Sequence, residues 1–512
     1  MGIVYLVQNI VKLFSPLNLV TVFLACQLGI IFGMLPGLTA TMGIALLTTL
    51  TFKWSTGNAI MTLLAIYVGA IYGGSRSAIL LNIPGTPAAA ATCLDGHPLA
   101  KSGRGAEAIG LATTSSFFGS IIGLLALSLF TPVLGNIALD FQSFEVFWLA
   151  VFGVAICGNL TAPKDPIKGW ISGILGILLS CCGMEAIQGH PRFTFGVLDL
   201  YSGFSLIPVM VGTFGLAEIL LNLTGGQKKQ VIANIGRVVP QLASVLKHWF
   251  VSVRSGIIGI FIGLVPGVGE SIAAYVSYDF AKRASKHPEE YGNGSVEGLI
   301  AAETANNACT GGALIPVLSL AIPGSAPAAV LLAALWLHNV RPGPLIMIES
   351  PGYIYEFSAM FFYASVAMLV LGLLIVKPLL KILQVKNSLL MPIIFMFCVV
   401  GTYAINGRLF DIGVMIVFGV IGFIMRKHGY PVAPLVLALI LGPMVDENLR
   451  RGLILTNGNF LPFIQGPISI ILVIAIFFTL FGRTKPVRIA VRFVFKPVTL
   501  LISVIKKQGK RK

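Results

Sequence analysis

Residues 70–91 read AIYGGSRSAILLNIPGTPAAAA, and residues 308–333 read ACTGGALIPVLSLAIPGSAPAAVLLA. Both stretches are apolar enough to lie in a membrane, yet each contains a Gly-Gly pair, a Pro-Gly break and hydroxyl residues. A proline inside a helix leaves the carbonyl four residues earlier without its backbone donor, which is costly in hydrocarbon unless a cavity or a ligand satisfies it. Two matched breaks therefore predict a transport site built from broken helices.

The composition of the chain is that of a membrane protein. Of its 512 residues, 56% are hydrophobic and 11% are charged, with a mean hydropathy of +0.91, whereas a soluble domain carries about 25% charged residues. Apolar runs of about 20 residues, long enough to span a bilayer, recur throughout, and the short alternating segments of a β-barrel do not. We predict an all-α polytopic integral membrane protein with about 10–12 transmembrane helices in two repeats.

The two halves of the chain repeat the same motifs in the same order. Residues 263–274, GLVPGVGESIAA, echo residues 33–44, GMLPGLTATMGI, and the IPGS of the second break echoes the IPGT of the first. The correspondences are offset by 230 and 239 residues, which indicates an internal duplication rather than a solenoid. We predict a first transmembrane repeat over 1–225, a cytoplasmic amphipathic basic connector over 226–254, a second transmembrane repeat over 255–482 and a basic cytoplasmic tail over 483–512.

The distribution of positive charge favours inverted repeats. Loops with an excess of Lys and Arg stay in the cytoplasm. Where that excess falls on different loops in the two halves, corresponding loops lie on opposite faces of the membrane. Each LPG or VPG motif is then expected at the tip of a re-entrant hairpin. The tail carries ten Lys or Arg and no acid, which favours the cytoplasmic surface. In the first half, the loop after the first motif holds Lys53, and the polar loop predicted over 95–104, after the second motif, holds Lys101 and Arg104. In the second half the excess of positive charge is reversed: Lys282, Arg283 and Lys286 follow the first motif, and Arg341 follows the second.

The residues around the breaks are candidates for binding an anion. The helices that follow the breaks would point their N-terminal amides at the gap, which favours negative charge. Arg76 is costly within a span and could bind a carboxylate in bidentate fashion, or it could snorkel or pair with an acid instead. The competing interpretation of the small residues is that they only tighten helix packing. The predicted substrate-binding residues are Ser75, Arg76, Ser77, Asn82, Gly85, Thr86, Asn306, Asn307, Thr310, Gly324 and Ser325.

Two acids within apolar surroundings, Glu270 and Glu303, are candidates for coupling transport to a cation, although each could equally pair with Arg76 or lie at a wet loop. Backbone carbonyls at the LPG and VPG tips could join them. The seven cysteines show no metal or disulfide spacing, and no GxSxG, HExxH or P-loop motif occurs, so we predict no structural metal, no cofactor and no catalytic residues. The predicted ion-coupling residues are Pro36, Gly37, Thr39, Pro266, Gly267, Glu270 and Glu303.

The longest motifs resemble a known family. They are GMLPGLTATMGIALLTTLTF at 33–52, YGGSRSAILLNIPGTPAAAATCLDGHPLAKSGRG at 72–105, and the stretch 263–325 that begins GLVPGVGE and ends LAIPGS. Together they resemble the large membrane subunit of tripartite tricarboxylate transporters, the TctA family. The resemblance implies a multi-pass permease of the bacterial inner membrane that works with a small membrane subunit and a periplasmic solute-binding protein. It also implies import of a tricarboxylate or related carboxylate by symport with Na⁺, or alternatively H⁺.

Other functions remain open on the residues alone. A non-transporting membrane scaffold or receptor that senses a carboxylate is the alternative to a permease, and uptake of labelled carboxylate into vesicles separates the two. A cation channel is disfavoured, because the sequence has no continuous acidic ring or carbonyl-filter motif. A nucleic-acid partner is disfavoured because the basic tail follows directly on a membrane span, whereas a homo-oligomer is compatible with the sequence.

Overall fold

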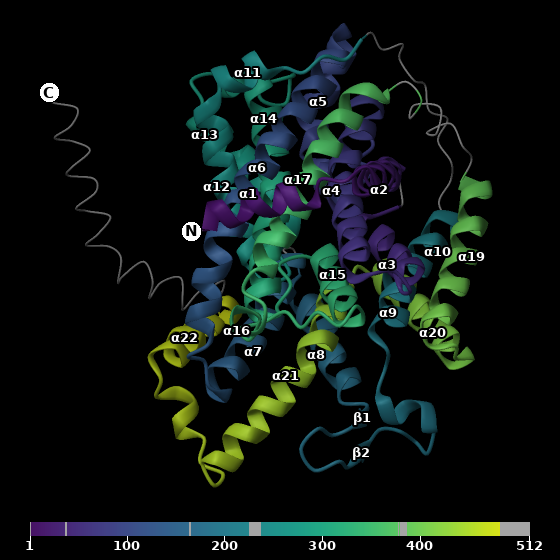
Figure 1. The fold of residues 1–512 in the computed structure, drawn as a ribbon, viewed down its shortest axis with the longest axis vertical. Coiled ribbons are helices and arrows are strands. Elements are labelled where there is room, and N and C mark those ends of the chain that lie inside the picture. Colours follow the sequence, from purple (N-terminus) through teal and green to yellow (C-terminus); the bar gives the residue numbers. More distant parts are fainter. Residues whose placement is uncertain are drawn as a thin grey trace, which may run out of the picture.

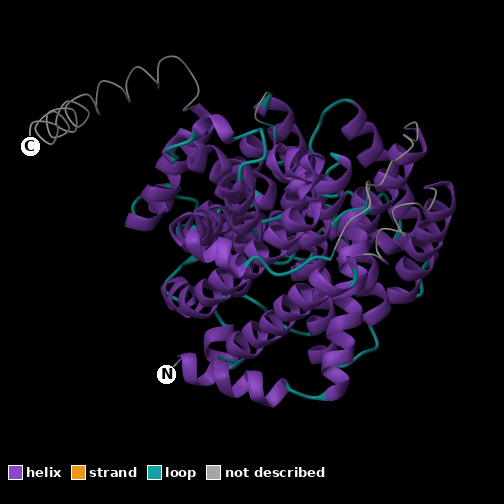
Figure 2. Ribbon diagram, turned by 90° about the horizontal axis from the view of Figure 1, so that it is seen from above, coloured by secondary structure: helices purple, strands orange, loops and turns teal. Residues whose placement is uncertain are grey.

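The structure is a computed structural model that describes residues 2–35, 38–162, 165–224, 237–376, 378 and 387–481. Helices make up most of the described part (Figures 1 and 2). The strands described there are β1 (Gly183–Met184) and β2 (Pro191–Arg192), which pair antiparallel. Seven helical segments among the described residues are long and apolar enough to cross a membrane, so the predicted all-α polytopic class is confirmed. They are Pro16–Met34, Thr56–Leu81, Thr92–Ala138, Ser143–Thr161, Leu206–Leu223, Tyr353–Leu374 and Leu409–Lys427.

Helix boundaries in the first half follow local sequence signals. Helix α2 begins where Ser15 accepts a hydrogen bond from the backbone of Asn18 (3.2 Å) with a proline at the first helical position, and it ends before Pro36. The elements are α1 (Gly2–Leu13), α2 (Pro16–Met34), α3 (Ala40–Thr51), α4 (Thr56–Leu81), η1 (Pro87–Ala90), α5 (Thr92–Leu99), η2 (Ala100–Arg104), α6 (Gly105–Ala138), α7 (Ser143–Thr161), α8 (Pro166–Ser180), η3 (Leu198–Ser202), α9 (Leu206–Met210), η4 (Val211–Leu216) and α10 (Ala217–Thr224).

The second half starts a similar series of helices, and Ser295 and Ser325 cap the two that flank the second break, α14 and α15. Its elements are α11 (Leu242–Lys247), α12 (Trp249–Leu264), α13 (Gly269–Ala284), η5 (Pro288–Glu290), α14 (Val296–Leu320), α15 (Ala326–Leu337), α16 (Ile346–Glu349), α17 (Tyr353–Leu374), α19 (Asn387–Asn406), α20 (Leu409–Lys427), α21 (Ala433–Leu455), η6 (Leu461–Ile464) and α22 (Pro467–Phe481).

The two broken helices, α4 and α14, end in the same way. Each stops at a residue in the left-handed conformation, Asn82 (φ 55°) and Ala321 (φ 57°), which are 239 positions apart. This conformation is unfavourable for an alanine, so the surrounding packing must impose it. The backbone N–H beyond each break returns to the helix in matching fashion: that of Gly85 donates to the carbonyl of Gly74, and that of Gly324 donates to the carbonyl of Ala313, both at 3.4 Å.

The halves pack against each other reciprocally. Helix α2 packs on α4 as α12 packs on α14, while α6 packs on α14 and α17 on α4. Likewise α15 contacts α3, η1 contacts α13, and α4 contacts α14. In Figure 1, α5 and α13 lie in the upper half of the molecule and α3 and α15 in the lower half. Under the duplication α13 is equivalent to α3, and α15 to the segment that follows the first break, so equivalent elements lie at different heights in reversed order, which supports the inverted arrangement. The inversion and the predicted region boundaries stay predictions.

The polar loop predicted over 95–104 is instead helical, forming the end of α5 and all of η2. The reason is tertiary: Asp95 is buried, and one of its carboxylate oxygens accepts backbone hydrogen bonds from Gly292 (2.8 Å), Gly294 (2.9 Å) and Ser295 (2.8 Å). These contacts hold α5 against the loop that precedes α14 and so fix its conformation. The apolar helix α12 begins at Trp249, within the residues 226–254 predicted as the connector, and the connector itself stays a prediction. Residues 226–236 of the connector and the tail 483–512 lie outside the described residues.

Candidate functional site

The second break is held by a buried group of three side chains. Ser325 begins α15, where its hydroxyl accepts a hydrogen bond from the backbone of Ala328 (3.3 Å). The hydroxyls of Ser325 and Tyr67 lie 2.7 Å apart, and that of Tyr67 also donates to the carboxylate of Glu270. Tyr67 comes from α4, whereas Glu270 is the second residue of α13, where helix N-terminal amides favour a negative charge. The group therefore links both repeats at the second break.

The VPG loop closes over the same break. The backbone N–H of Gly267 donates to the carbonyl of Pro323, and that of Gly269 donates to the carbonyl of Gly324, both at 3.2 Å. Gly267 and Gly269 have φ values of 73° and 75°, a conformation that side-chain-bearing residues rarely adopt. The carbonyls of Pro323 and Gly324 at the second break are thus satisfied by the loop itself. Coordination of a cation by the VPG tip stays a prediction, and Pro36 and Gly37 lie outside the described residues.

A second buried acid, Glu303 on α14, is surrounded by hydroxyls. Its carboxylate accepts hydrogen bonds from Ser75 on α4 (2.7 Å), from Ser116 on α6 (2.7 Å) and from Thr92 at the start of α5. All four side chains have at most 1% of their surface exposed. We call these four residues the Glu303 cage. Within the described part of the chain, no Lys, Arg or His forms an ion pair with the Glu303 carboxylate.

Arg76 lies in the core but pairs with neither buried acid. Its guanidinium donates to the carbonyl of Gly372 (2.6 Å), makes a longer contact with that of Leu371 (3.4 Å), and contacts the Tyr72 hydroxyl at 3.3 Å. It thus stabilises the carbonyl end of α17, where a cation is favoured by the helix dipole. One terminal nitrogen, Nη1, has no hydrogen-bond partner among the described residues. Binding of a substrate carboxylate by Arg76 stays a prediction.

Several predicted substrate-binding residues carry buried polar atoms that have no partner among the described residues. They are the hydroxyls of Thr86 and Thr310, both amide atoms of Asn306, and the amide oxygen of Asn307, whose nitrogen donates to Ser120 (3.2 Å). Leaving such groups unpaired is costly in a protein interior. Three of these residues, Asn306, Asn307 and Thr310, belong to α14, and they follow Glu303 by three, four and seven positions, which places them on the same helix face. These atoms mark where a polar ligand could bond.

Other predicted site residues have local structural roles. The Ser77 hydroxyl donates to the carbonyl of Gly74 (3.2 Å), and Thr39 begins α3 by accepting from the backbone of Met42 (3.2 Å). Asn82 is exposed at the end of α4. These three side chains lie outside the two buried acid groups, and their binding roles stay predictions.

Gly85 and Gly324 are required for close packing at the two breaks. A Cβ on Gly85 would collide with the carbonyl oxygen of Gly33 near the end of α2, and a Cβ on Gly324 would collide with that of Gly263 near the end of α12. Both glycines are buried. The two breaks differ in one respect: Pro84 at the first break is exposed, whereas Pro323 at the second break is buried. Pro266 of the VPG loop is buried as well.

Sequence reasoning missed Tyr67, Thr92 and Ser116. Tyr67 lies at the position equivalent to Asn306 under the offset of 239, so the duplication itself could have singled it out. Thr92 follows the first break, but nothing in its sequence neighbourhood indicates contact with an acid more than 200 residues away. Ser116 belongs to the run TTSS at 113–116, which resembles ordinary small-residue helix packing.

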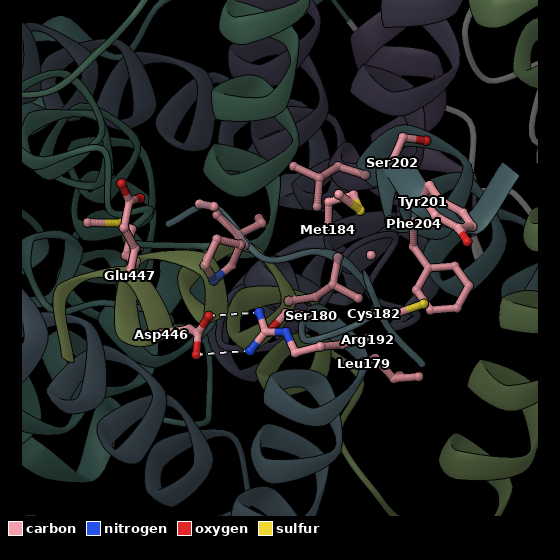
Figure 3. A pocket seen from close by; sticks show the side chains of 18 of the residues that line it. Leu179, Ser180, Cys182, Met184, Arg192, Tyr201, Ser202, Phe204, Asp446 and Glu447 are labelled. Carbon is pink, nitrogen blue, oxygen red and sulfur yellow. Dashed lines mark hydrogen bonds and ion pairs between the residues drawn. The ribbon is translucent and has the colours of Figure 1, made fainter. Parts of the chain in front are cut away.

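Two cavities border the helices around the site. A small one of about 10 Å³ touches Ser325 and Gly267 beside the second break. A larger one of about 650 Å³ lies between the β1–β2 hairpin and α21 (Figure 3). There Arg192 donates to both carboxylate oxygens of Asp446, at 3.2 and 2.8 Å. Burial raises the pKa of Asp446, but hydrogen bonds from Arg192 and Arg450 outweigh this and hold the pKa below its usual range.

Comparison with known proteins agrees with the motifs. A profile of the tripartite tricarboxylate transporter TctA family matches residues 19–437. An uncharacterized 52.8 kDa protein from the TAR-I ttuC' 3' region of Agrobacterium vitis is 35% identical over 458 residues, covering 89% of this chain and 91% of that protein. An uncharacterized protein from the TAR-II ttuC' 3' region of the same organism is 34% identical over 211 residues, covering 41% of this chain and 87% of that protein. No solved structure matches the chain. The predicted resemblance is confirmed, and this multi-pass membrane protein belongs to the tripartite tricarboxylate transporter TctA family.

Proposed function

We propose that the chain is the permease subunit of a secondary transporter that imports a tricarboxylate or related carboxylate by ion symport. In this proposal it acts in the bacterial inner membrane with a small membrane subunit and a periplasmic solute-binding protein. The observation that carries the proposal is the set of buried polar atoms without described partners on Thr86, Asn306, Asn307 and Thr310. A protein that only anchored its partners would gain nothing from such costly groups in the core.

The substrate anion would bind where the two broken helices meet. Ser325 and Thr86 follow the breaks at equivalent positions of the duplication, and each precedes a new helical segment, α15 or η1. The N-terminal amides of α15 favour an anion. The cavity beside Ser325 is about 10 Å³, which is about the space that one water molecule needs and far less than a carboxylate needs. Substrate binding therefore requires a more open conformation, as alternating access demands.

Energy would come from a gradient of Na⁺, or alternatively of H⁺, and not from ATP. The sequence has no P-loop, and two acids are buried in the described core, Glu270 beside the second break and Glu303 beside the first. A buried carboxylate is costly and is usually functional in a membrane protein. The family is one of transporters, and we propose no catalytic activity for this chain.

The test is uptake of radiolabelled citrate, and then of other di- and tricarboxylates, into vesicles that contain all three subunits. We expect concentrative uptake when an inward Na⁺ or H⁺ gradient is imposed, and none when ionophores collapse both gradients in the presence of ATP. Vesicles with the two partner subunits alone are the control. The sensing-scaffold alternative predicts carboxylate binding without accumulation, and uptake driven by ATP with both gradients collapsed would disprove symport.

A further inference from the structure

The two buried acids differ in how their charge is compensated. Glu270 is the second residue of α13 and lies at its positive end. Glu303 is the eighth residue of the 25-residue helix α14, where the helix dipole contributes little because its effect falls off within the first turn. The described partners of Glu303 are neutral hydroxyls, which donate hydrogen bonds but carry no charge. A buried carboxylate without a counter-charge is strongly destabilising, so Glu303 must take up either a proton or a cation. Three hydroxyls donate hydrogen bonds to its oxygens, which favours the ionised form and therefore a cation as the ligand.

The composition of the cage indicates the kind of cation. Its members supply two carboxylate oxygens and three hydroxyl oxygens, and each hydroxyl keeps lone pairs after donating its proton. Hard oxygen ligands of this kind suit alkali and alkaline-earth cations rather than transition metals. One carboxylate carries one negative charge, so a monovalent ion leaves the site neutral while a divalent ion leaves an uncompensated charge. We propose that the Glu303 cage binds one monovalent alkali cation, with Na⁺ as the ion to be tested.

The position of the cage explains how the ion would influence transport. Ser75 lies on α4 before the first break and Thr92 on α5 after it, while Ser116 and Glu303 come from α6 and α14. Helix α14 packs against all three of the other helices, and α5, α6 and α14 lie together in the upper part of Figure 1. An ion drawing these oxygens together fixes the geometry of both arms of the first break. Thr86 lies between those arms, so a bound cation would also hold the Thr86 hydroxyl in position for the substrate. This coupling rests on the proposed function, whereas ion binding itself does not.

The experiment measures equilibrium binding of radiolabelled Na⁺ to the purified complex of the chain with its two partner subunits, in choline buffer. We expect saturable binding of one Na⁺ per chain and loss of that binding in Glu303→Gln. Thr92→Val and Ser116→Ala each remove one oxygen ligand and should weaken Na⁺ affinity about 10-fold, the low end of the effect of losing a bond to a charged group. Thermal unfolding supplies a second readout: Na⁺ should raise the midpoint of the wild type and not that of Glu303→Gln.

Thr48→Val is the matched control, because the Thr48 hydroxyl is equally buried but donates to the carbonyl of Ile44 on its own helix (2.8 Å). Its Na⁺ affinity should equal that of the wild type. A cooperative unfolding transition of Glu303→Gln in choline, with a midpoint at or above that of the wild type, shows that the variant is folded. Glu270→Gln asks whether the other acid holds the ion.

Wild-type Na⁺ affinity in Glu303→Gln, or loss of Na⁺ binding in Glu270→Gln but not in Glu303→Gln, would overturn the assignment. So would an absence of Na⁺ binding in a complex whose uptake depends on protons alone. Failure of the proposed function looks different: Na⁺ would bind and depend on Glu303, yet labelled carboxylate would not accumulate. Conversely, Na⁺-driven uptake that survives in Glu303→Gln would retain the function and reject the cage.

Discussion

At the scale of single residues, Thr86 and Ser325 occupy equivalent positions in the duplication but have different surroundings. The Thr86 hydroxyl has no partner among the described residues, whereas the Ser325 hydroxyl contacts Tyr67 and caps α15. A mutation at Thr86 therefore tests ligand binding alone. A mutation at Ser325 tests binding and folding together.

We expect Thr86→Val to weaken carboxylate binding roughly 10-fold to 150-fold, as for one lost hydrogen bond to a charged ligand, with little change in thermal stability. Ser325→Ala should weaken binding similarly and also cost about 1 kcal/mol of stability through the lost helix cap. The measurements are substrate affinity in uptake and the unfolding midpoint. Thr62→Val, whose hydroxyl donates to the carbonyl of Asn58 (2.7 Å) on α4, is the control. Unchanged affinity in the Thr86 and Ser325 double variant would reject this site.

At the scale of elements, the β1–β2 hairpin is attached to α21 by the Arg192–Asp446 ion pair. Removing the charge of Asp446 should release the hairpin, because the pair is bidentate and about three-quarters of each side chain is buried. We expect Asp446→Asn to raise amide hydrogen exchange across residues 183–203 about 10-fold at neutral pH, as for a loss of about 1.4 kcal/mol. The adjacent Glu447→Gln is the control, since Glu447 pairs with Arg451 on its own helix.

Acidification should have the same effect on the wild type. The pKa of Asp446 is lowered in the folded protein, so its contribution to stability is present above the pKa of the unfolded chain and is lost as the pH falls through the folded value. Hairpin exchange, corrected for the intrinsic pH dependence of the amides, should therefore rise more steeply in acid for the wild type than for Asp446→Asn. Some rise remains in the variant, because the Glu185 carboxylate accepts hydrogen bonds from the backbone of Ile187 and Gln188 within the hairpin and is protonated in both proteins. Equal protection in both proteins at neutral pH would show that the pair does not attach the hairpin.

At the scale of the whole molecule, the membrane orientation follows from the charge distribution. We expect cysteines placed at Lys228 and Lys510 to resist a membrane-impermeant maleimide added to the periplasmic side, because both positions lie in cationic segments predicted to be cytoplasmic. The segment Leu206–Leu223 is long enough to span the membrane, so the hairpin before it should face the periplasm. Leu198→Cys, at a position 85% exposed, should therefore react readily and serves as the positive control. Labelling at Lys228, or protection at position 198, would reject this orientation.

The sequence alone determined the membrane class, because the length of an apolar run decides whether it can span a bilayer. It also determined the duplicated Pro-Gly breaks, because proline and glycine act on the local backbone whatever the tertiary structure. The long motifs by themselves indicated the family. The sequence also singled out Glu303 as a buried acid, but it left open whether Arg76, water or an ion meets its charge. Only the tertiary structure decided that Glu303 contacts Ser75, Thr92 and Ser116, and that Arg76 instead binds the end of α17. Those contacts join residues about 190 to 300 positions apart, and they depend on how α4, α5, α6, α14 and α17 pack, which no local propensity encodes.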